Sequence, residues 1–236
     1  KTLFRDNNLG CKMSVSGAID WFFENEEMGI ILEDDCLPSQ SFFWFCEELL
    51  EKYKNNENIG MISGNNFFEE NKLKDSYLFS YGNIWGWASW RRAWQSYEVR
   101  MELWKNKSIQ DSIKLFLNND EIFKNFEIIF EEAYKGNIDT WDYQWLFTRM
   151  SKKFLTINPS VNLVRNIGFG EDATHTIGHS KFSNLKAYEI DFPLLHPQNI
   201  KVDSRYVRYQ YTQSKIQKTK NYIKNIIKLI IRGRKK

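Results

Sequence analysis

The chain has 236 residues, which lies within the range of one α/β domain and is long enough to bury a substantial core. Hydrophobic residues make up 42% and charged residues 27%, a globular composition that excludes a disordered or fibrous protein. Residues 1–203 carry 22 basic and 30 acidic side chains, a net charge of −8, whereas residues 204–236 carry 11 basic and no acidic ones. The acidic body argues against nucleic acid as a partner, because its carboxylates would repel phosphates.

Aromatic residues make up 16% of the chain, and this favours either an aromatic-rich core or a surface that stacks on ringed ligands such as sugars. The cysteines Cys11, Cys36 and Cys46 are odd in number and have no C-x-x-C spacing, so they predict neither a disulfide framework nor a zinc site. A reducing compartment, the cytoplasm, is expected. No apolar run approaches the roughly 18 residues of a membrane span. The first residue is Lys1 rather than Met, which suggests a fragment.

The first part of the chain predicts two helix-and-strand units. Residues 14–27 place apolar side chains at helical spacing, and residues 30–32 form a short uninterrupted apolar run, typical of a strand buried on both faces. Residues 41–56 repeat the helical pattern, and residues 59–64 read as a second buried strand. This alternation predicts an α/β fold with a mixed, mainly parallel sheet flanked by helices.

The middle of the chain is rich in aromatic residues and then helical. Residues 77–94, "YLFSYGNIWGWASWRRAW", are interrupted by glycines, and we expect a strand and a loop that lead to a short helix. Residues 108–135 have two apolar sets at helical spacing, and Asn118 and Asn119 predict a break between two helices.

The last part of the body predicts one more helix and a strand. Residues 137–153, "NIDTWDYQWLFTRMSKK", run helical with Asp139 at a capping position. Residues 154–168 are strand-like up to Gly168.

The end of the chain, residues 214–236, has isoleucines on one side and lysines elsewhere, the pattern of an amphipathic basic helix. We therefore divide the chain into a catalytic-type domain, residues 1–203, and a basic tail, residues 204–236. The tail can lie on an anionic membrane surface, which would make the protein peripheral at the inner face of the membrane. It can equally pack on the domain through its isoleucines.

Three consecutive acids, Glu33, Asp34 and Asp35, follow the first buried strand directly. In an open α/β sheet, ligands bind beyond the carboxyl ends of the strands. If the strand geometry persists, Glu33 and Asp35 point one way and Asp34 the other. One face can then hold Mg²⁺ or Mn²⁺, which prefer hard carboxylate oxygens, and the other can accept hydrogen bonds from a sugar hydroxyl. The alternative is a solvated acidic turn or a cap for the next helix.

Residues 29–53, "GIILEDDCLPSQSFFWFCEELLEKY", resemble the metal-binding segment of GT-A fold glycosyltransferases. They are particularly similar to the N-acetylglucosaminyltransferase I family, and also resemble bacterial surface-polysaccharide glycosyltransferases. Residues 84–94 are similar to the Gly-Trp loop of these enzymes, and residues 140–145, "TWDYQW", to their W-D-x-x-W segment. Three matches in order are more specific than one. The resemblance implies a GT-A (nucleotide-diphospho-sugar transferase) fold whose first strand and helix, expected before residue 5, are missing.

The resemblance also implies roles for individual acids. Asp35 would be the direct ligand of Mn²⁺ or Mg²⁺, with Glu33 and Asp34 on the nucleotide ribose or on metal-bound water. Asp142 would be the general base that deprotonates the acceptor hydroxyl. The alternative for Asp142 is purely structural: with Asp139 as N-cap, it would be an acid that favours the helix dipole.

Further contacts follow from the same resemblance. Residues 5–10, "RDNNLG", are similar to a segment near the nucleotide, which suggests Arg5 and Asn8 as nucleotide contacts, although turn residues alone explain this stretch. His175 resembles a second metal ligand, with a hydrogen-bonded loop residue as the alternative. We interpret His196, next to Pro197, as structural.

Tryptophans surround these motifs. Trp85, Trp87 and Trp90 can form an apolar wall against the sugar or the acceptor, and Gly86 hints at a close backbone approach. Trp141 flanks Asp142 and would remove water from its carboxylate. Core packing is the alternative for each tryptophan.

The hypothesis from the sequence is a metal-dependent inverting glycosyltransferase of the hexosyl- or N-acetylhexosaminyl-transferase type. It would move a sugar from a nucleotide-diphosphate donor to a glycan or lipid-linked acceptor in polysaccharide or glycoconjugate synthesis. One alternative is a non-catalytic carbohydrate-binding domain of the same fold. A Mg²⁺-dependent phosphotransferase that uses the same acids is another.

Overall fold

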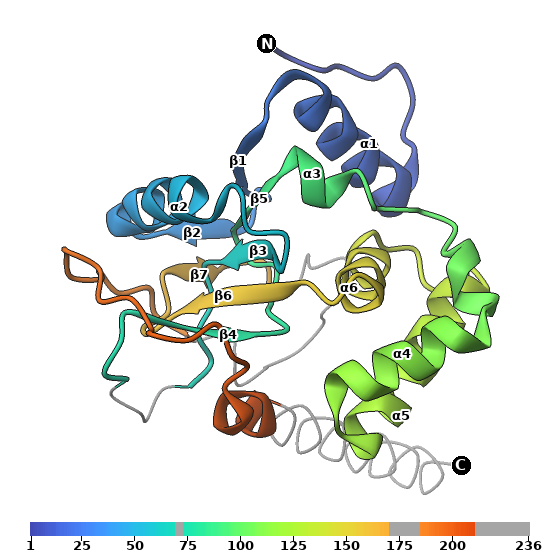
Figure 1. Ribbon diagram of the computed structural model, residues 1–236. Helices are drawn as coiled ribbons and strands as arrows, with labels where there is room; N and C mark the ends of the chain where they lie inside the picture. The colour runs from blue at the N-terminus through green and yellow to red at the C-terminus, as the bar shows by residue number, and fades with distance from the viewer. Residues whose placement is uncertain (69–72, 170–184, 211–236) are drawn as a thin grey trace, which may run out of the picture.

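The computed structural model describes residues 1–68, 73–169 and 185–210 (Figure 1). In this part of the chain a five-stranded and a two-stranded sheet are flanked by helices, which confirms the predicted α/β class. The helices are α1 (Gly10–Asn25), α2 (Gln40–Tyr53), α3 (Arg91–Trp94), the 3-10 helix η1 (Glu102–Lys105), α4 (Lys107–Leu117), α5 (Asp120–Tyr134) and α6 (Asp142–Ser151). The strands are β1 (Met28–Ile31), β2 (Cys36–Pro38), β3 (Ile59–Ser63), β4 (Tyr77–Ser80), β5 (Trp87–Trp90), β6 (Leu155–Pro159) and β7 (Val164–Asn166).

The five-stranded sheet has the strand order β1-β5-β3-β6-β4. Among the described strands, β3 and β6 pair in parallel, whereas β1 with β5, β3 with β5, and β4 with β6 pair antiparallel. The second sheet is the antiparallel pair of β2 and β7. The sheet is therefore mixed but mostly antiparallel, and the prediction of a mainly parallel sheet is wrong.

The reason for the error lies in the position of β5. The unit from β1 through α2 to β3 does place two strands in the same direction, as the alternation predicts. However, Ala88 of β5 pairs with Ile30 on one side and with Ile62 on the other, so β5 separates the two strands. Strand and helix alternation gives the direction of successive strands, not their neighbours in the sheet. As an edge strand, β1 is only half-buried, contrary to the prediction of burial on both faces.

Local signals place the helices of the second half well. Asn118 takes a left-handed conformation with φ 46° after α4, and the Asn119 side chain caps α5 by accepting from the main-chain N–H groups of Glu121 and Ile122. This confirms the predicted break. The next helix, α6, begins later than predicted, because Trp141 rather than Asp139 occupies the capping position.

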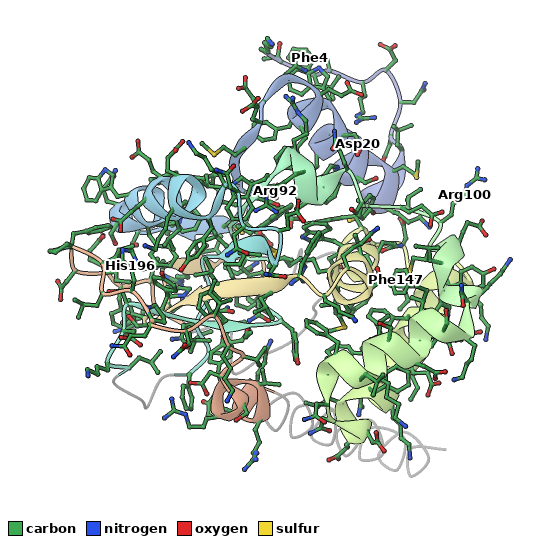
Figure 2. The ribbon with its side chains drawn as sticks, in the orientation of Figure 1. Phe4, Asp20, Arg92, Arg100, Phe147 and His196 are labelled. Carbon is green, nitrogen blue, oxygen red and sulfur yellow. The ribbon has the colours of Figure 1, made fainter. Side chains whose placement is uncertain are left out.

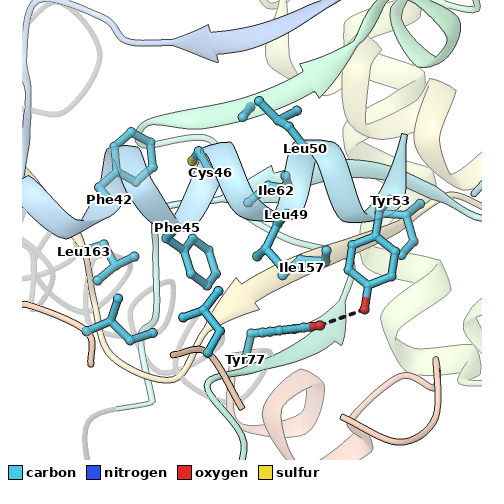
Figure 3. Close-up of a cluster of buried hydrophobic side chains, with 14 of the residues drawn as sticks. Phe42, Phe45, Cys46, Leu49, Leu50, Tyr53, Ile62, Tyr77, Ile157 and Leu163 are labelled. Carbon is cyan, nitrogen blue, oxygen red and sulfur yellow. Dashed lines mark hydrogen bonds between the residues drawn. The ribbon is translucent and has the colours of Figure 1, made fainter. Parts of the chain in front are cut away.

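A hydrophobic core joins α2 to the large sheet (Figure 3). Phe42, Phe45 and Leu49 recur at helical spacing and are fully buried. At the end of the same helix, the hydroxyl groups of Tyr53 and Tyr77 form a hydrogen bond of 2.7 Å, the dashed line in Figure 3. Replacing one of these phenylalanines by Ala would cost about 3–5 kcal/mol, so α2 holds the sheet firmly.

Helix α6 lies between two further cores. Phe147 and Met150 belong to a cluster with α4 and α5, whereas Trp145 belongs to a cluster with α1 and α3. Figure 1 shows α6 at the end of the sheet, with α4 and α5 beyond it. Because packing fixes α6 from both sides, the direction in which its remaining face points is fixed as well.

The strands β1, β3 and β6 all run in one direction, so their carboxyl ends lie along the same side of the sheet, which runs across the strands. The acids Glu33, Asp34 and Asp35 follow β1 on this side, and Asn65 and Asn66 follow β3. The N-terminal end of the antiparallel strand β5 lies there too, because Trp87 pairs with Ser63 at the end of β3. Polar groups and the Gly-Trp loop therefore gather on this side.

Candidate active site

Glu33, Asp34 and Asp35 form a turn directly after β1. The main-chain N–H of Cys36 donates to the carbonyl oxygen of Glu33 at 3.0 Å and closes the turn. The extended geometry of β1 therefore does not continue through the acids, and the expected alternation of their side chains along a strand is wrong. Asp34 is exposed at the tip of the turn, whereas Glu33 and Asp35 are half-buried.

The Asp35 carboxylate is held in place by the two-stranded sheet. Its Oδ2 accepts a hydrogen bond of 3.0 Å from Nδ2 of Asn166, at the end of β7. Its main-chain oxygen accepts from the N–H of Ile167 at 2.8 Å. Gly168 packs so closely that an added Cβ would lie 2.4 Å from Oδ2. A partner that orients a carboxylate in this way is common behind metal ligands.

Glu33 has an unusual acidity. Its pKa is raised to about 7, mostly by burial and in addition by the carboxylates of Asp35, Asp142 and Asp34. Like charges that approach one another in a partly dehydrated place disfavour ionisation. A bound cation would reverse this effect, because it would neutralise the repulsion.

Asp142 is the first residue of α6. The hydroxyl of Thr140 donates a hydrogen bond to its Oδ1, and the side chain lies in the first turn, where the helix dipole favours a negative charge. Asp142 also lines a cavity of about 610 Å³ between the loop after β4, α5 and α6. The position combines a stabilised carboxylate with access to an enclosed space.

The start of α1 completes this group of acids. Asn8 accepts a hydrogen bond from the N–H of Gly10 at 2.9 Å, and Asp139 accepts a long one from Lys12 at 3.4 Å. Burial raises the pKa of the Cys11 thiol, and the charges of Glu33, Asp139 and Asp142 raise it further. Three segments of the predicted site, residues 5–10, 33–35 and 140–145, therefore meet.

Arg5 precedes α1, and its side chain packs on that helix. Its Nη2 donates to the carbonyl oxygen of Ser14 at 3.3 Å, and the same guanidinium packs against Gly17. The side chain is exposed, and the structure gives it no contact with the acids described above.

The Gly-Trp loop contributes one aromatic side chain to the cavity. Trp85 is half-buried, lines the cavity and contacts Phe67 and Phe169 edge-on, with ring centroids 5.3 and 5.4 Å apart. Gly86 has φ 64°, and an added Cβ would lie 2.8 Å from Cγ2 of Val164. The hint of a close backbone approach is thus explained by packing against β7.

Trp87 and Trp141, predicted as substrate contacts, are core side chains in the structure. Each is 1% exposed, and their rings stack with centroids 5.7 Å apart. Both belong to the cluster that joins α1, α3 and α6. Trp90 is buried as well, in the core below α2. The alternative of core packing therefore describes these three residues, and Trp85 is the tryptophan of this loop that faces a cavity.

A hollow of about 460 Å³ lies beside the acids. It is formed between α1 and β1, and Glu33 and Asp34 line one end of it. Asp142 lines the larger cavity, and its charge reaches Glu33. The acids therefore border two spaces that can each hold a ligand.

Arg149 is a residue that the sequence interpretation did not single out. It lies on α6 two turns after Asp142, lines the larger cavity and is 2% exposed. Burial lowers its pKa to about 9, and the charge of Asp142 opposes this effect. A basic residue on the apolar face of a helix is the signal that could have revealed it.

Asp35 and Glu33 lie close together and offer the hard oxygens that Mn²⁺ and Mg²⁺ prefer, so the residues present suit such a cation. Within the described ranges, no three His, Cys, Asp or Glu side chains form a group that could surround a metal. His175 and most of the basic tail lie outside the described residues.

His196 lies far from this site. Its Nδ1 is 3.0 Å from the hydroxyl of Tyr77, and its Nε2 is 3.3 Å from a carboxylate oxygen of Glu48. Figure 2 shows His196 and Phe147 of α6 on opposite sides of the molecule. The contacts of His196 are with α2 and β4, away from the acids.

Each helix in the described part of the chain is too short or too polar to cross a membrane. No protein-family model and no curated protein matches the chain.

Proposed function

We propose that the protein is a metal-dependent inverting glycosyltransferase of GT-A type, which transfers a sugar from a nucleotide diphosphate to a glycan or lipid-linked acceptor. One observation supports this most. The segments that resemble such enzymes, residues 33–35, 84–94 and 140–145, are far apart in the chain but contribute to one place. A resemblance carried by unrelated surface segments would not bring a metal-type acid, an aromatic wall and a base-type acid together.

The donor would lie at the hollow lined by Glu33 and Asp34. Asp35, oriented by Asn166, would hold Mn²⁺ or Mg²⁺ together with Glu33, and such a cation supplies the positive charge that stabilises a departing diphosphate. After burial, the neighbouring carboxylates contribute to the raised pKa of Glu33, and a bound cation would relieve their repulsion. Donor and cation would therefore favour each other's binding.

The acceptor would lie in the cavity of about 610 Å³, with its hydroxyl at Asp142. The hydroxyl of Thr140 donates to Oδ1 of Asp142, and the Asp142 carboxylate would accept the hydroxyl proton as the hydroxyl oxygen attacks the sugar. Attack by this hydroxyl on the face of the sugar opposite the leaving group would invert the anomeric carbon. Trp85 would pack against the sugar or the acceptor.

The test is a transfer assay on the purified protein. A panel of nucleotide sugars is incubated with glycan and lipid-phosphate acceptors, with Mn²⁺ and with EDTA. We expect transfer that requires the cation and falls by about 10²–10⁴-fold in Asp142→Asn, the range for loss of a general base.

Asp120→Asn is the matched control, because Asp120 is the first residue of another helix and is exposed. It should keep full activity. An Asp142→Asn variant with normal folding and undiminished transfer would remove the assignment of the base. Binding of glycans that is indifferent to nucleotide and cation, without any transfer, would instead favour a carbohydrate-binding domain.

A further inference from the structure

The guanidinium of Arg149 is buried but only partly satisfied. Its Nη1 donates to the hydroxyl of Thr156 on β6 at 2.7 Å and to the carbonyl oxygen of Tyr81. Through these two bonds it fastens the loop after β4 to the sheet. A guanidinium carries five N–H donors, and this structural task uses the two on Nη1.

The remaining donors form one edge of the side chain. Nε is fully buried and has no acceptor among the described residues, and Nη2 makes none of the hydrogen bonds found there. The ion pairs among the described residues do not include Arg149, although the charge of Asp142 acts on it through space. The Nε and Nη2 edge is the side-on fork that binds a carboxylate or phosphate with two parallel hydrogen bonds.

The fork belongs to a residue that lines the large cavity. Asp142, Leu146 and Arg149 recur at a spacing of four and three residues, so one face of α6 presents an acid, an apolar side chain and a cation to the same space. The opposite walls include Trp85, Phe126 and other apolar side chains. Buried cations are ordinarily paired, and an unpaired one beside an apolar cavity points to a partner that arrives with the ligand.

We propose that this cavity binds an anionic amphiphile, whose phosphate or carboxylate pairs with the Nε and Nη2 edge of Arg149 and whose apolar part packs against Trp85 and Phe126. The anion would occupy the end of the cavity away from Asp142. Under the proposed function, on which only this last step rests, the ligand is the acceptor, and its hydroxyl group reaches Asp142.

The experiment is a titration of the whole chain, without donor or metal, followed by calorimetry and tryptophan fluorescence. The probes are octyl phosphate, octanoate and the neutral octyl glucoside, all below their micelle concentrations. At least one anionic probe should bind about tenfold or more tightly than the neutral probe, and the better of the two identifies the source of the anion as phosphate or carboxylate. Equal binding of all three probes would overturn the proposal.

Two variants place the binding in this cavity. Arg149→Met should weaken the anionic probes by about 10- to 100-fold and leave octyl glucoside nearly unchanged, because a charge-assisted fork is lost. Leu146→Trp, which fills the cavity without touching the fork, should weaken all probes. If Arg149→Met does not fold, the comparison of probes on the unaltered protein and the effect of Leu146→Trp still decide the question.

Lys124→Met is the matched control, since Lys124 also lines the cavity but is exposed. It should retain the preference for anions. Loss of this preference in Lys124→Met and not in Arg149→Met would overturn the proposal. The titration measures no transfer, so the two proposals can fail separately. Anion binding by a protein without transferase activity would contradict the proposed function alone. Transfer without any preference for anions would contradict the present proposal alone.

Discussion

Glu33 and Asp142 belong to segments far apart in the chain, yet their carboxylates interact: burial raises the pKa of Glu33 most, and Asp142 is one of the acids that raise it further. Glu33 follows β1, and Asp142 begins α6. The interaction shows that the end of β1 and the start of α6 lie near each other. A charge that enters the site would therefore change the pKa of Glu33.

The first prediction concerns stability and pH. The folded protein keeps a proton on Glu33 that the unfolded chain releases, because the pKa is about 7 when folded against an ordinary value of 4.5. Stability should therefore decline as pH rises from about 4.5 through about 7. Glu33→Gln should stabilise the fold by up to about 3 kcal/mol at pH 8 and change it little at pH 4.5.

Urea denaturation of both proteins at the two pH values checks this prediction. Glu24→Gln is the control, because Glu24 is an exposed acid on α1. A stability of Glu33→Gln that matches the unaltered protein at pH 8 would contradict the raised pKa.

The second prediction concerns Asn166, which orients the proposed metal ligand Asp35. Asn166→Ala removes the hydrogen bond that orients Asp35, and Mn²⁺ should then bind about 10- to 100-fold more weakly, as is usual when such a support is lost. Calorimetric titration with Mn²⁺ measures the effect, with Asn55→Ala, an exposed loop position, as control. Unchanged affinity in a folded Asn166→Ala protein would show that Asp35 needs no such support.

The third prediction separates backbone strain from packing. Gly86 and Gly136 both have positive φ, 64° and 77°, but an added Cβ meets Val164 at 2.8 Å in the first case and nothing within 4 Å in the second. Gly136→Ala should cost about 1 kcal/mol of stability and Gly86→Ala roughly 2–4 kcal/mol. Thermal denaturation compares them, and equal costs would contradict the close packing of Gly86 on β7.

The fourth prediction compares two tryptophans of one loop. Trp87→Ala should destabilise the fold by about 3–5 kcal/mol, because the ring lies fully inside the tryptophan cluster. Trp85→Ala should cost less stability but weaken ligands of the large cavity, which Trp85 lines. Chemical denaturation and titration with the octyl probes check both expectations. If a folded Trp87→Ala protein bound the probes more weakly than Trp85→Ala does, the prediction would be contradicted.

Features that depend on neighbouring residues were predictable from the sequence. Asn118 ends α4 in the left-handed conformation, which asparagine tolerates, and the Asn119 side chain caps α5. Both effects act within a few residues of the chain. The acids at the end of β1 were placed correctly at a strand terminus for the same reason. The sequence alone locates the motifs that resemble glycosyltransferases. It does not predict how close together they lie in the folded protein.

Features that depend on distant residues were not predictable. The insertion of β5 between β1 and β3 is decided by pairing across the sheet, and no local pattern near Ala88 encodes it. The burial of Trp87 and the exposure of Trp85 to a cavity depend on α6 and β7, which come much later in the chain. Arg149 escaped notice because arginine is ordinarily a surface residue.

The packing of α6 between two cores has a consequence for ligand size. Seven positions apart on one helix, Asp142 and Arg149 stand roughly 10 Å from each other along its axis. Under the two proposals, a ligand that pairs with both residues would carry its hydroxyl and its anion at a matching separation. Inserting a single residue between them would turn the fork by roughly 100° out of register with the acid, so the selection of ligands by length is built into the helix itself.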